Sequence, residues 1–577
     1  MALAAILAGV APLLAMPVAS VASAGSSPPS PGESSTWKCS SPLRELLAAA
    51  RPTDTIAVWI FLADRGSAAE KGNPLCLSAR AAGRRVLRGE ASARARDLPV
   101  HHGYVDSLRG HATRIRHASR YFNAVSAEME AREIPAVCVL GFVRSVDLIA
   151  SHRRLPDPTA EPPRGSFSAR AACAECGIDY GESFDQLNQV GAIDLLEGGY
   201  NGSGSVSGGG PVLIAILDTG FRLDHPALAD VQVEAQYDFI NNDSVTSNES
   251  GDPTGQDTHG TQVLGVIAGH AEGDLVGPAW GARYLLAKTE IVGSETFIEE
   301  DHWVAGIEWA DSAGADVVTS SLGYIQWYTP DQLDGNTALC TRAADIAASH
   351  GIVVVNSAGN EGTSGLVAPA DGDSVLAIGA VDRTGAIASF SSRGPTADGR
   401  TKPDFTAMGV GVRSVSISTG YGSYNGTSFA APIVAGVCAL LLEIHPDWSP
   451  MEMRDTLRAT SSRSAAPDNT YGWGIPNAML AVRPVRSDLS VAAFPNPFNA
   501  SMSICVTVNA PSAVTVKVYD IRGAHIKTLA ESRAVQRSLT LNWDGTNERG
   551  DRVASGVYFL AISSGGSTRT IKAVLVR

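Results

Sequence analysis

The pattern of apolar and polar residues divides the chain into parts with different predicted structures. Residues 2–16 form a short apolar run at the N-terminus. Residues 55–63 are an apolar run rich in β-branched and aromatic side chains, which predicts a strand, and the Ala- and Arg-rich residues 78–96 predict a helix. The pattern over 121–150 predicts strand, helix and strand. We therefore expect a small α+β unit before residue 150.

From residue 211 onward, apolar strand patterns alternate with helical ones. Strands are predicted at 212–217, 316–319 and 352–356, and helices at 261–269, 304–313 and 428–444. Such alternation is typical of a parallel sheet with helices on both faces. Residues 489–577 change to short β patterns with turn signals and no predicted helix, which indicates an all-β sandwich.

Four segments follow from these changes. The apolar run ends in the small residues 22–24, which predicts a secretory signal peptide over 1–24. A membrane anchor is the alternative, but Pro12 and Pro17 interrupt the run. We expect no later stretch to span a bilayer. The other segments are residues 25–170, ending in an Arg- and Pro-rich linker, an α/β domain over 171–483, and a β domain over 484–577.

Charge is distributed unevenly over these segments. Residues 25–170 carry a net charge of +7, residues 171–483 carry −26, and residues 484–577 carry +5. A basic leader before an acidic body suggests that the two attract each other, although acidic residues also simply keep an exported protein soluble. An acidic body gives no reason to expect nucleic-acid binding.

The cysteines place little constraint on the predicted fold. Eight cysteines in 577 residues are too few for a disulfide scaffold. Cys173 and Cys176 could pair locally, and no other pairing can be deduced. Cys438 lies in an apolar helical run and is expected to be a buried thiol.

Three polar residues stand in contexts that suit nucleophilic catalysis. Asp218 follows an apolar strand, His259 opens a helix of small residues, and Ser428 opens the last long helix. Each alone has an ordinary explanation, because Asp-Thr-Gly also occurs in aspartic proteases and a serine at a helix start is often only an N-cap. An aspartic protease needs a second such motif after an apolar strand, and the sequence has none.

Taken together, these contexts resemble the motifs of the subtilisin-like serine protease family. The resemblance rests on Pro211–Gly220, His259–Gly265 and Gly426–Pro432, in the family's order, and covers about residues 178–483. It implies an α/β fold with a doubly wound, mostly parallel sheet and a site at the carboxyl ends of the strands.

The resemblance also implies a mechanism and a triad. His259 would take the proton of the Ser428 hydroxyl, and Asp218 would orient the imidazole, so that an acyl-enzyme can form. The protein would then be a secreted serine endopeptidase that hydrolyses peptide bonds in polypeptide substrates. No cofactor is required for this chemistry.

Further site residues come from the same resemblance. Asn360, in an Asn-rich segment that could otherwise be a turn, is expected to form the oxyanion hole together with the backbone N–H of Ser428. The expected substrate-binding residues are Ser321, Leu322, Gly323 and Gly359. Val367 stands where the family often has glycine in the wall of the primary pocket, which predicts a shallower pocket.

Two positions depart from the family pattern. Gln262 replaces a second histidine, which is not a member of the triad. Ala227 stands where many relatives have a calcium-ligating aspartate, so the family's strong calcium site is in doubt. A structural calcium ion could bind elsewhere on the acidic body, and its ligands are unknown.

Both flanking segments have resemblances of their own. Residues 55–150 resemble the family's inhibitory propeptide, so the chain is expected to be a self-processing zymogen that is cleaved between about 164 and 179. Residues 489–577 resemble type IX secretion sorting domains and hook-capping immunoglobulin-like domains, which implies export and attachment to secretion machinery or the cell surface. A plain accessory sandwich is the alternative.

Two other functional classes compete with a protease. A non-catalytic surface protein could keep the fold as a scaffold, but drift would erode the triad and Asn360 first. A lipase or esterase would need Gly-x-Ser-x-Gly and the order Ser, Asp, His, which the context of Ser428 does not fit.

Overall fold

The structure is a computed structural model. It describes residues 38–66, 76–149, 151–152, 177–293, 295–326, 328–417, 419–482, 489–508, 512–535, 538–564 and 567–576. The predicted signal peptide, the linker up to residue 171, and Cys173 and Cys176 lie outside the described residues. The chain divides into two compact units, one of Met1–Asn73 with Pro99–Ile149 and the other of Pro74–Leu98 with Ala150–Arg577.

The first unit is a four-stranded antiparallel sheet with helices. Its strands are ordered β2-β3-β1-β4. The predicted strand, helix and strand over 121–150 are confirmed as β3, α4 and β4, whereas α1, α3 and β2 were not predicted. The elements are α1 (Ser41–Ala49), β1 (Thr55–Leu62), α3 (His102–Arg109), β2 (Ala112–Ser119), β3 (Ala124–Glu130), α4 (Ile134–Cys138) and β4 (Val143–Ile149).

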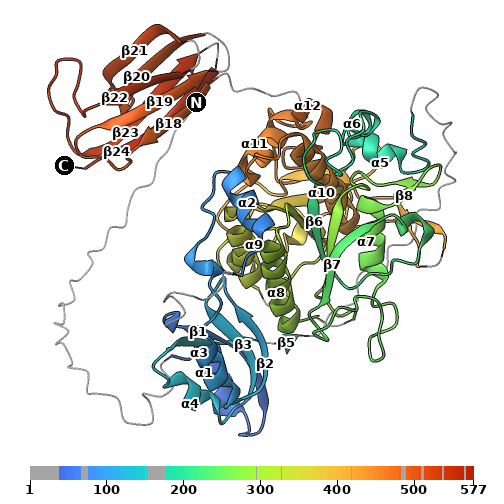
Figure 1. Ribbon diagram of the computed structural model, residues 1–577. Coiled ribbons are helices and arrows are strands. Elements are labelled where there is room, and N and C mark those ends of the chain that lie inside the picture. The colour runs from blue at the N-terminus through green and yellow to red at the C-terminus, as the bar shows by residue number, and fades with distance from the viewer. Residues whose placement is uncertain are drawn as a thin grey trace, which may run out of the picture. The chain divides into compact units, whose positions relative to one another are not determined.

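A seven-stranded parallel sheet forms the centre of the second unit (Figure 1). Each of the three predicted strands is present, shifted by one residue, as β6, β12 and β13, and these three are buried along their length because helices cover both faces. In sheet order the strands are β15 (Phe405–Met408), β14 (Leu376–Val381), β13 (Val353–Ser357), β12 (Val317–Ser320), β6 (Leu213–Asp218), β10 (Arg283–Lys288) and β7 (Gln232–Asp238).

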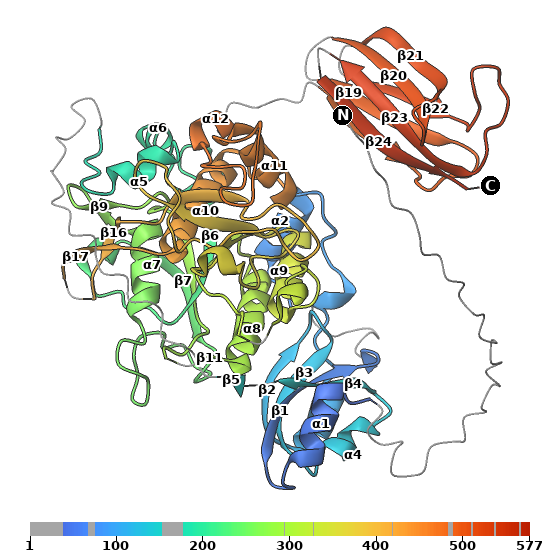
Figure 2. The same ribbon diagram turned by 180° about the vertical axis from the view of Figure 1, so that it is seen from behind.

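The helices of this unit lie on both faces of the sheet. Helices α7 and α10 contact each other and the sheet on one face, and α8 and α9 lie side by side on the other (Figures 1 and 2). Helix α8 begins seven residues before its predicted start. The helices are α5 (Phe184–Gln189), α6 (Ile193–Glu197), α7 (Thr258–Ala268), α8 (Phe297–Ala313), α9 (Leu339–Ser349), α10 (Thr427–Ile444), α11 (Pro450–Thr460) and α12 (Ala478–Val482).

Short elements complete the unit. The predicted helix over 78–96 is present only as α2, which ends just before Gly89, a glycine with a φ of +76°. The short elements are α2 (Ala79–Leu87), the 3₁₀ turns η2 (Ala95–Asp97) and η3 (Pro226–Leu228), and the strands β5 (Ser151–His152), β8 (His270–Ala271), β9 (Leu275–Val276), β11 (Glu295–Thr296), β16 (Val412–Val415) and β17 (Tyr421–Tyr424).

Helix α10 is the central core helix. Contrary to the expectation of no later spanning stretch, α10 is long and apolar enough to cross a membrane by length and composition alone, but 89% of it is buried inside the protein. Gly436 lies against Pro278, because an added Cβ would come within 2.2 Å of the proline ring. Cys438 is buried here as predicted, and burial raises the pKa of its thiol to about 12.

The C-terminal part is all β, as predicted. Two antiparallel sheets share one apolar core, in which Phe498, Trp543 and Tyr558 contact one another. The indole N–H of Trp543 donates to the Thr546 carbonyl. The sheets are β18 (Leu489–Phe494), β19 (Met502–Val508) and β22 (Ser538–Trp543), and β21 (His525–Val535), β20 (Ser512–Asp520), β23 (Gly556–Ser564) and β24 (Ser567–Leu575).

Because the described core of this β part contains only its own residues, we predict that it unfolds independently. Ending the chain at residue 483 should remove one calorimetric transition and shift the main transition by less than about 2 °C. A much larger fall of the main transition temperature, relative to the full-length chain, would contradict independent folding.

Candidate active site

Asp218 is the last residue of β6 and is fully buried. Its Oδ1 accepts hydrogen bonds from the backbone N–H of Thr219 at 2.7 Å and from the Thr219 hydroxyl at 3.2 Å. Burial together with these bonds fixes one orientation of the carboxylate at the carboxyl end of a central strand.

His259 is the second residue of α7, and its side chain is 31% exposed. Its Nδ1 lies 2.7 Å from Asp218 Oδ1. Because a carboxylate can only accept, Nδ1 carries the proton and Nε2 is the nitrogen available as a base. Asp218 and His259 are therefore brought together as the sequence predicts.

Gly260 allows α7 to approach the end of β6. A Cβ at this position would lie 2.2 Å from the Gly220 carbonyl oxygen and 3.0 Å from Asp218 Cβ. Further along α7, Gly265 lies against Ser414, and an added Cβ would come within 2.4 Å of its hydroxyl. The small residues noted after His259 thus serve close packing.

Ser428 is the second residue of α10 and is 9% exposed. Its hydroxyl donates to the Ser321 carbonyl at 3.3 Å, and the Ser321 hydroxyl donates to the Ser428 carbonyl at 2.7 Å. The next residue, Phe429, contacts His259, with ring centroids 5.9 Å apart. Ser428 therefore lies against the predicted substrate edge at the positive end of the α10 dipole, and the residue after it contacts the histidine.

The side chain of Asn360 has a fixed orientation. Its Oδ1 accepts from both the backbone N–H and the hydroxyl of Thr427, each at 3.0 Å. A backbone N–H can only donate, so the carbonyl end of the amide faces Thr427 and the amide nitrogen is left as a donor beside Gly426. Thr427 is a positioning residue that sequence reasoning missed, although it directly precedes Ser428.

The predicted substrate edge follows β12. The Leu322 carbonyl accepts from the side chain of Asn356 at 3.0 Å, which holds the segment against β13. Among the described residues, the backbone N–H and C=O of Gly323 have no hydrogen-bond partner. This leaves a short edge to which an extended peptide could add.

Val367 fills the space between the two predicted glycines of the pocket. A Cβ on Gly323 would lie 2.2 Å from Val367 Cγ2, and a Cβ on Gly359 would lie 2.8 Å from Val367 Cγ1. Val367 is 5% exposed. The three residues meet, and a valine side chain narrows the space between them.

Gln256 is a further positioning residue that sequence reasoning missed. It is fully buried, and its amide donates to the Thr219 carbonyl at 2.6 Å, while its Oε1 accepts from the N–H of Val292 at 2.9 Å. It therefore ties the segment after Asp218 to the segment after β10. Its position in the sequence, three residues before His259, is the signal that could have indicated this role.

Comparison with known proteins agrees with this geometry. The family model described as "Subtilase family" matches residues 209–474. A subtilisin from Bacillus pumilus is 34% identical over 304 residues, which are 52% of this chain and 98% of the relative. Subtilisin E from Bacillus subtilis is 34% identical over 304 residues, covering 52% and 70%, and subtilisin DY from Bacillus licheniformis is 36% identical over 281 residues, covering 48% and 92%.

The chain belongs to the subtilase family.

The flanking segments of this subtilase also match family models. Residues 57–162 match the model described as "Peptidase S8 propeptide domain, Bacteroidota", and residues 492–577 match "Secretion system C-terminal sorting domain". The chain is therefore a secreted serine protease of the subtilase family with a propeptide and a sorting tail.

Charged groups near the site are paired within the protein. The Lys288 ammonium lies 2.8 Å from Asp238 and 2.7 Å from Asp252, so Asp238, the buried member of the acidic group of Asp238, Asp243 and Glu249, is already paired with a lysine. Ala227 is buried in η3 and offers only a methyl group. These described residues identify no ligand set for calcium.

We predict that Gly260→Ala lowers turnover of a peptide substrate by about 100-fold, since the backbone carbonyl of Gly220 cannot move aside and His259 must shift. Gly210→Ala is the matched control, because an added Cβ there meets nothing within 4 Å. Equal activity of the two variants would show that the α7 approach does not set the Asp218–His259 geometry.

Proposed function

We propose that this subtilase is a secreted serine endopeptidase with the triad Asp218, His259 and Ser428, made as a self-processing zymogen. The observation that carries the proposal is the 2.7 Å contact between His259 Nδ1 and Asp218 Oδ1, together with the contact of that imidazole with Phe429, the residue after Ser428 at the start of α10.

The chemistry follows from the hydrogen-bond roles. With Nδ1–H donated to Asp218, the Nε2 lone pair of His259 can take the proton of the Ser428 hydroxyl as Oγ attacks the scissile carbonyl. The imidazolium then returns that proton to the leaving amine, and Asp218 stabilises the charged ring. Water hydrolyses the acyl-enzyme by the same steps in reverse order.

The oxyanion of the tetrahedral intermediate needs two donors. The Asn360 amide nitrogen can be one, since Thr427 holds the other end of that amide. The backbone N–H of Ser428 is the other, at the N-terminal end of a long helix whose dipole favours negative charge.

Polypeptide substrates would bind as an added strand along Ser321, Leu322 and Gly323. Main-chain recognition of this kind accepts many sequences, so specificity rests on the primary pocket. Because Val367 occupies the space between Gly323 and Gly359, we expect a preference for small side chains before the cleaved bond.

No metal takes part in the proposed chemistry, because serine, histidine and aspartate supply nucleophile, base and orientation. A structural calcium ion remains a proposal without named ligands. So do the attachment to secretion machinery or the cell surface and the likeness of the tail to hook-capping immunoglobulin-like domains.

The test of the triad is the purified Ser428→Ala protein. It should keep its fold and lose casein hydrolysis, self-cleavage and labelling by a serine-directed phosphonate. Asn360→Ala should keep the label and lose roughly 10²–10³ in turnover, a magnitude known from the equivalent loss in subtilisin. Normal casein hydrolysis by Ser428→Ala would refute the assignment, and an unlabelled wild type would favour a non-catalytic scaffold.

The pocket gives a second prediction. Val367→Gly should raise the ratio of kcat/KM for a substrate with phenylalanine before the cleaved bond, relative to alanine, by at least about tenfold. Val367→Ile should lower the same ratio. If all three proteins give one ratio, Val367 does not line the pocket.

A further inference from the structure

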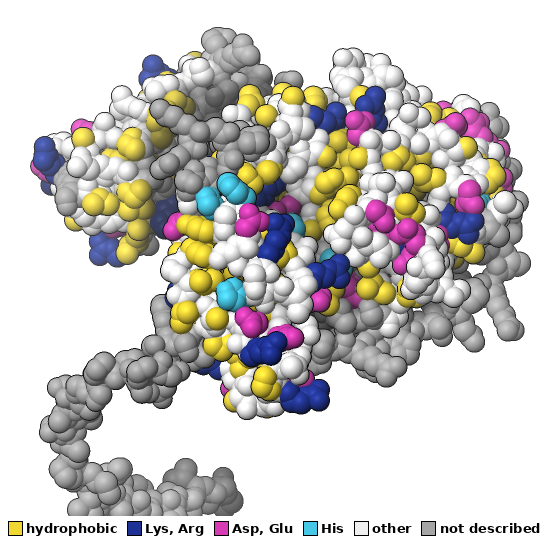
Figure 3. Space-filling model, turned by 60° about the horizontal axis from the view of Figure 1, so that its bottom comes forward, with side chains coloured by type: hydrophobic (Ala, Val, Ile, Leu, Met, Phe, Trp, Pro, Cys, Tyr) yellow, Lys and Arg dark blue, Asp and Glu magenta, His cyan; other side chains and the backbone are white. Residues whose placement is uncertain are grey.

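The net charges of the segments do not identify which groups of the basic propeptide contact the acidic peptidase domain. On the face in Figure 3, basic side chains lie next to acidic ones, with histidines among them. Residues 74–98 belong to the same compact unit as the peptidase domain, unlike the propeptide residues before 74 and over 99–149, and they contact it through specific arginines. We call residues 78–97 the arginine arm, which contains α2 and η2.

The arm covers the C-terminal end of α8. Without the arm the last carbonyls of a helix have no partner in the helix, and the helix end carries a partial negative charge. Four consecutive carbonyls, from Ser312 to Ala315, accept from the arm; the donors are Ser78 N at 2.9 Å, Ser78 Oγ at 2.9 Å, Arg80 Nε at 3.2 Å, and Arg84 Nη1.

The close approach of the arm depends on Gly314. Its φ is +99°, and an added Cβ would lie 2.8 Å from the backbone nitrogen of Ala81 in the first turn of α2. The peptidase domain thus has a backbone surface shaped to receive this helix.

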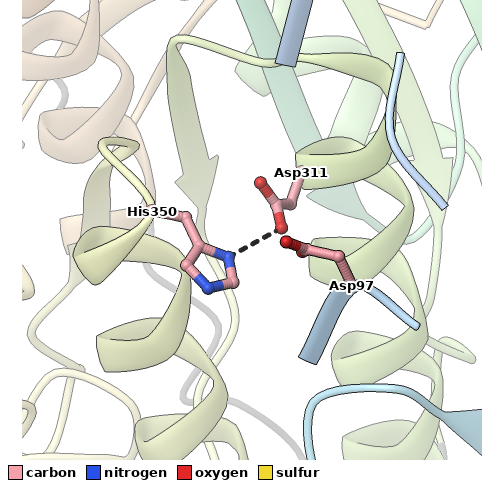
Figure 4. A group of neighbouring side chains, drawn as sticks. All are labelled: Asp97, Asp311 and His350. Carbon is pink, nitrogen blue, oxygen red and sulfur yellow. Dashed lines mark hydrogen bonds and ion pairs between the residues drawn. The ribbon is translucent and has the colours of Figure 1, made fainter. Parts of the chain in front are cut away.

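Arg85 is the deepest contact, with a fully buried side chain. Its guanidinium binds Asp97 of the arm at 2.6 and 3.0 Å and Asp311 of α8 at 2.9 and 3.2 Å. It also lies 2.9 Å from His350 Nδ1, just after α9, and that nitrogen is 2.9 Å from Asp311. Figure 4 shows the two carboxylates and the imidazole pointing toward one another from three different elements.

Two further arginines converge on Asp316. Arg80 binds one carboxylate oxygen at 2.6 Å and Arg88 the other at 3.0 Å. Arg88 is almost fully buried and also donates to the carbonyls of Gly351 and Pro446.

These contacts lie at the opposite end of the sheet from the proposed triad. Asp316 accepts from the N–H of Leu213, the first residue of β6, whereas Asp218 is the last. Five residues of strand separate the two positions by about 16 Å.

We propose that the C-terminal ends of α8 and α9 form a guanidinium-binding docking site whose ligand is the arginine arm. The arm, bound away from the active site, holds the propeptide on the peptidase domain and is released in acid. The proposal rests on the zymogen function above and adds the surface that retains the propeptide.

Acid sensitivity follows from the groups around His350. Arg84 and Arg85 of α2, Asp97 of η2 and Asp311 of α8 surround it, and Arg94 binds the neighbouring Ser349 at 3.3 Å. Two guanidiniums balance two carboxylates, so a charged imidazole would be an uncompensated buried cation.

The direction of the pH effect can be derived. Burial lowers the pKa of His350, with Asp311 opposing and Arg85 reinforcing that effect. When the arm leaves, Arg85 no longer opposes a charged imidazole, while Asp311 of α8 stays beside the ring, so the undocked His350 binds a proton more readily. Protonation therefore favours the undocked state, and docking weakens as the pH falls.

The group of Asp97, Asp311 and His350 also has the spacing of a metal site. In the docked chain, however, the Arg85 guanidinium already binds both carboxylates and lies 2.9 Å from His350 Nδ1. The cation of this site is an arginine, which selects a peptide ligand rather than a metal ion.

The test is hydrogen exchange of residues 82–88 in the full-length Ser428→Ala chain, which stays uncleaved and requires no activity. An isolated helix as short as α2 is marginal in water, so its protection reports docking. Arg85→Gln should lower the protection factor at pH 7.5 by about 30-fold or more. Arg109→Gln, which removes an exposed arginine of α3, should leave it unchanged.

Acid release is tested in the same chain. The protection factor of residues 82–88, corrected for intrinsic exchange, should fall at least about tenfold from pH 7.5 to pH 5.5, and His350→Gln should abolish that fall.

A second variant covers a folding failure. If α10 of Arg85→Gln shows no protection from exchange, that variant has not folded. Arg80→Gln, which removes a partly exposed arginine, should then give a smaller loss of protection over 82–88. Unchanged protection in the arginine variants would overturn the docking site, and a pH-independent wild type would overturn acid release. Both results are measured on a chain whose mass shows that it is intact, so neither depends on whether Ser428 is the nucleophile.

Discussion

The hydrogen bond between Asp218 and His259 can form only because a helix start and a strand end meet with no side chain between them. Gly260 faces the Gly220 carbonyl at a distance that no Cβ could occupy. The same closeness continues along α7, where Gly265 lies against Ser414. The position of the imidazole is thus set by backbone contacts, and the buried helix α10 places Phe429, the residue after Ser428, against it.

Burial on both faces of the parallel sheet requires that charged groups inside the unit be paired. Lys288 is fully buried at the end of β10 between Asp238 and Asp252. Lys402 and Arg458 bind the two oxygens of the buried Asp404. Pairs of this kind contribute little net stability, because desolvation offsets attraction, but removing one partner is costly. They therefore favour a single arrangement of the loops that surround the strand ends.

The propeptide uses two different kinds of interaction. Its four-stranded sheet has an apolar core of its own, as a small folding unit needs. The arginine arm has almost no apolar core and depends on carbonyl groups and carboxylates supplied by the ends of α8 and α9. Apolar burial is insensitive to pH near neutrality, whereas a guanidinium cluster that contains a histidine is not.

The sequence by itself determined the parts that depend on local pattern. Continuous apolar strands alternating with helices predicted a parallel sheet and placed three of its strands, β6, β12 and β13, to within a residue. Three short motifs pointed to Asp218, His259 and Ser428 as the proposed triad, because a nucleophilic serine requires a base and an orienting carboxylate. Val367 was predicted to make the primary pocket shallower, and its side chain lies against both Gly323 and Gly359.

Only the tertiary structure decided which distant residues meet. Gln256 and Thr427 position the site through hydrogen bonds that have no sequence signature. The Ala- and Arg-rich stretch predicted a helix, but its period could not show that Arg85 would be buried against Asp311 and His350, more than 200 residues away. Helical pattern reports how a segment folds locally, whereas the partner of a buried charge is chosen by the packing of the whole domain.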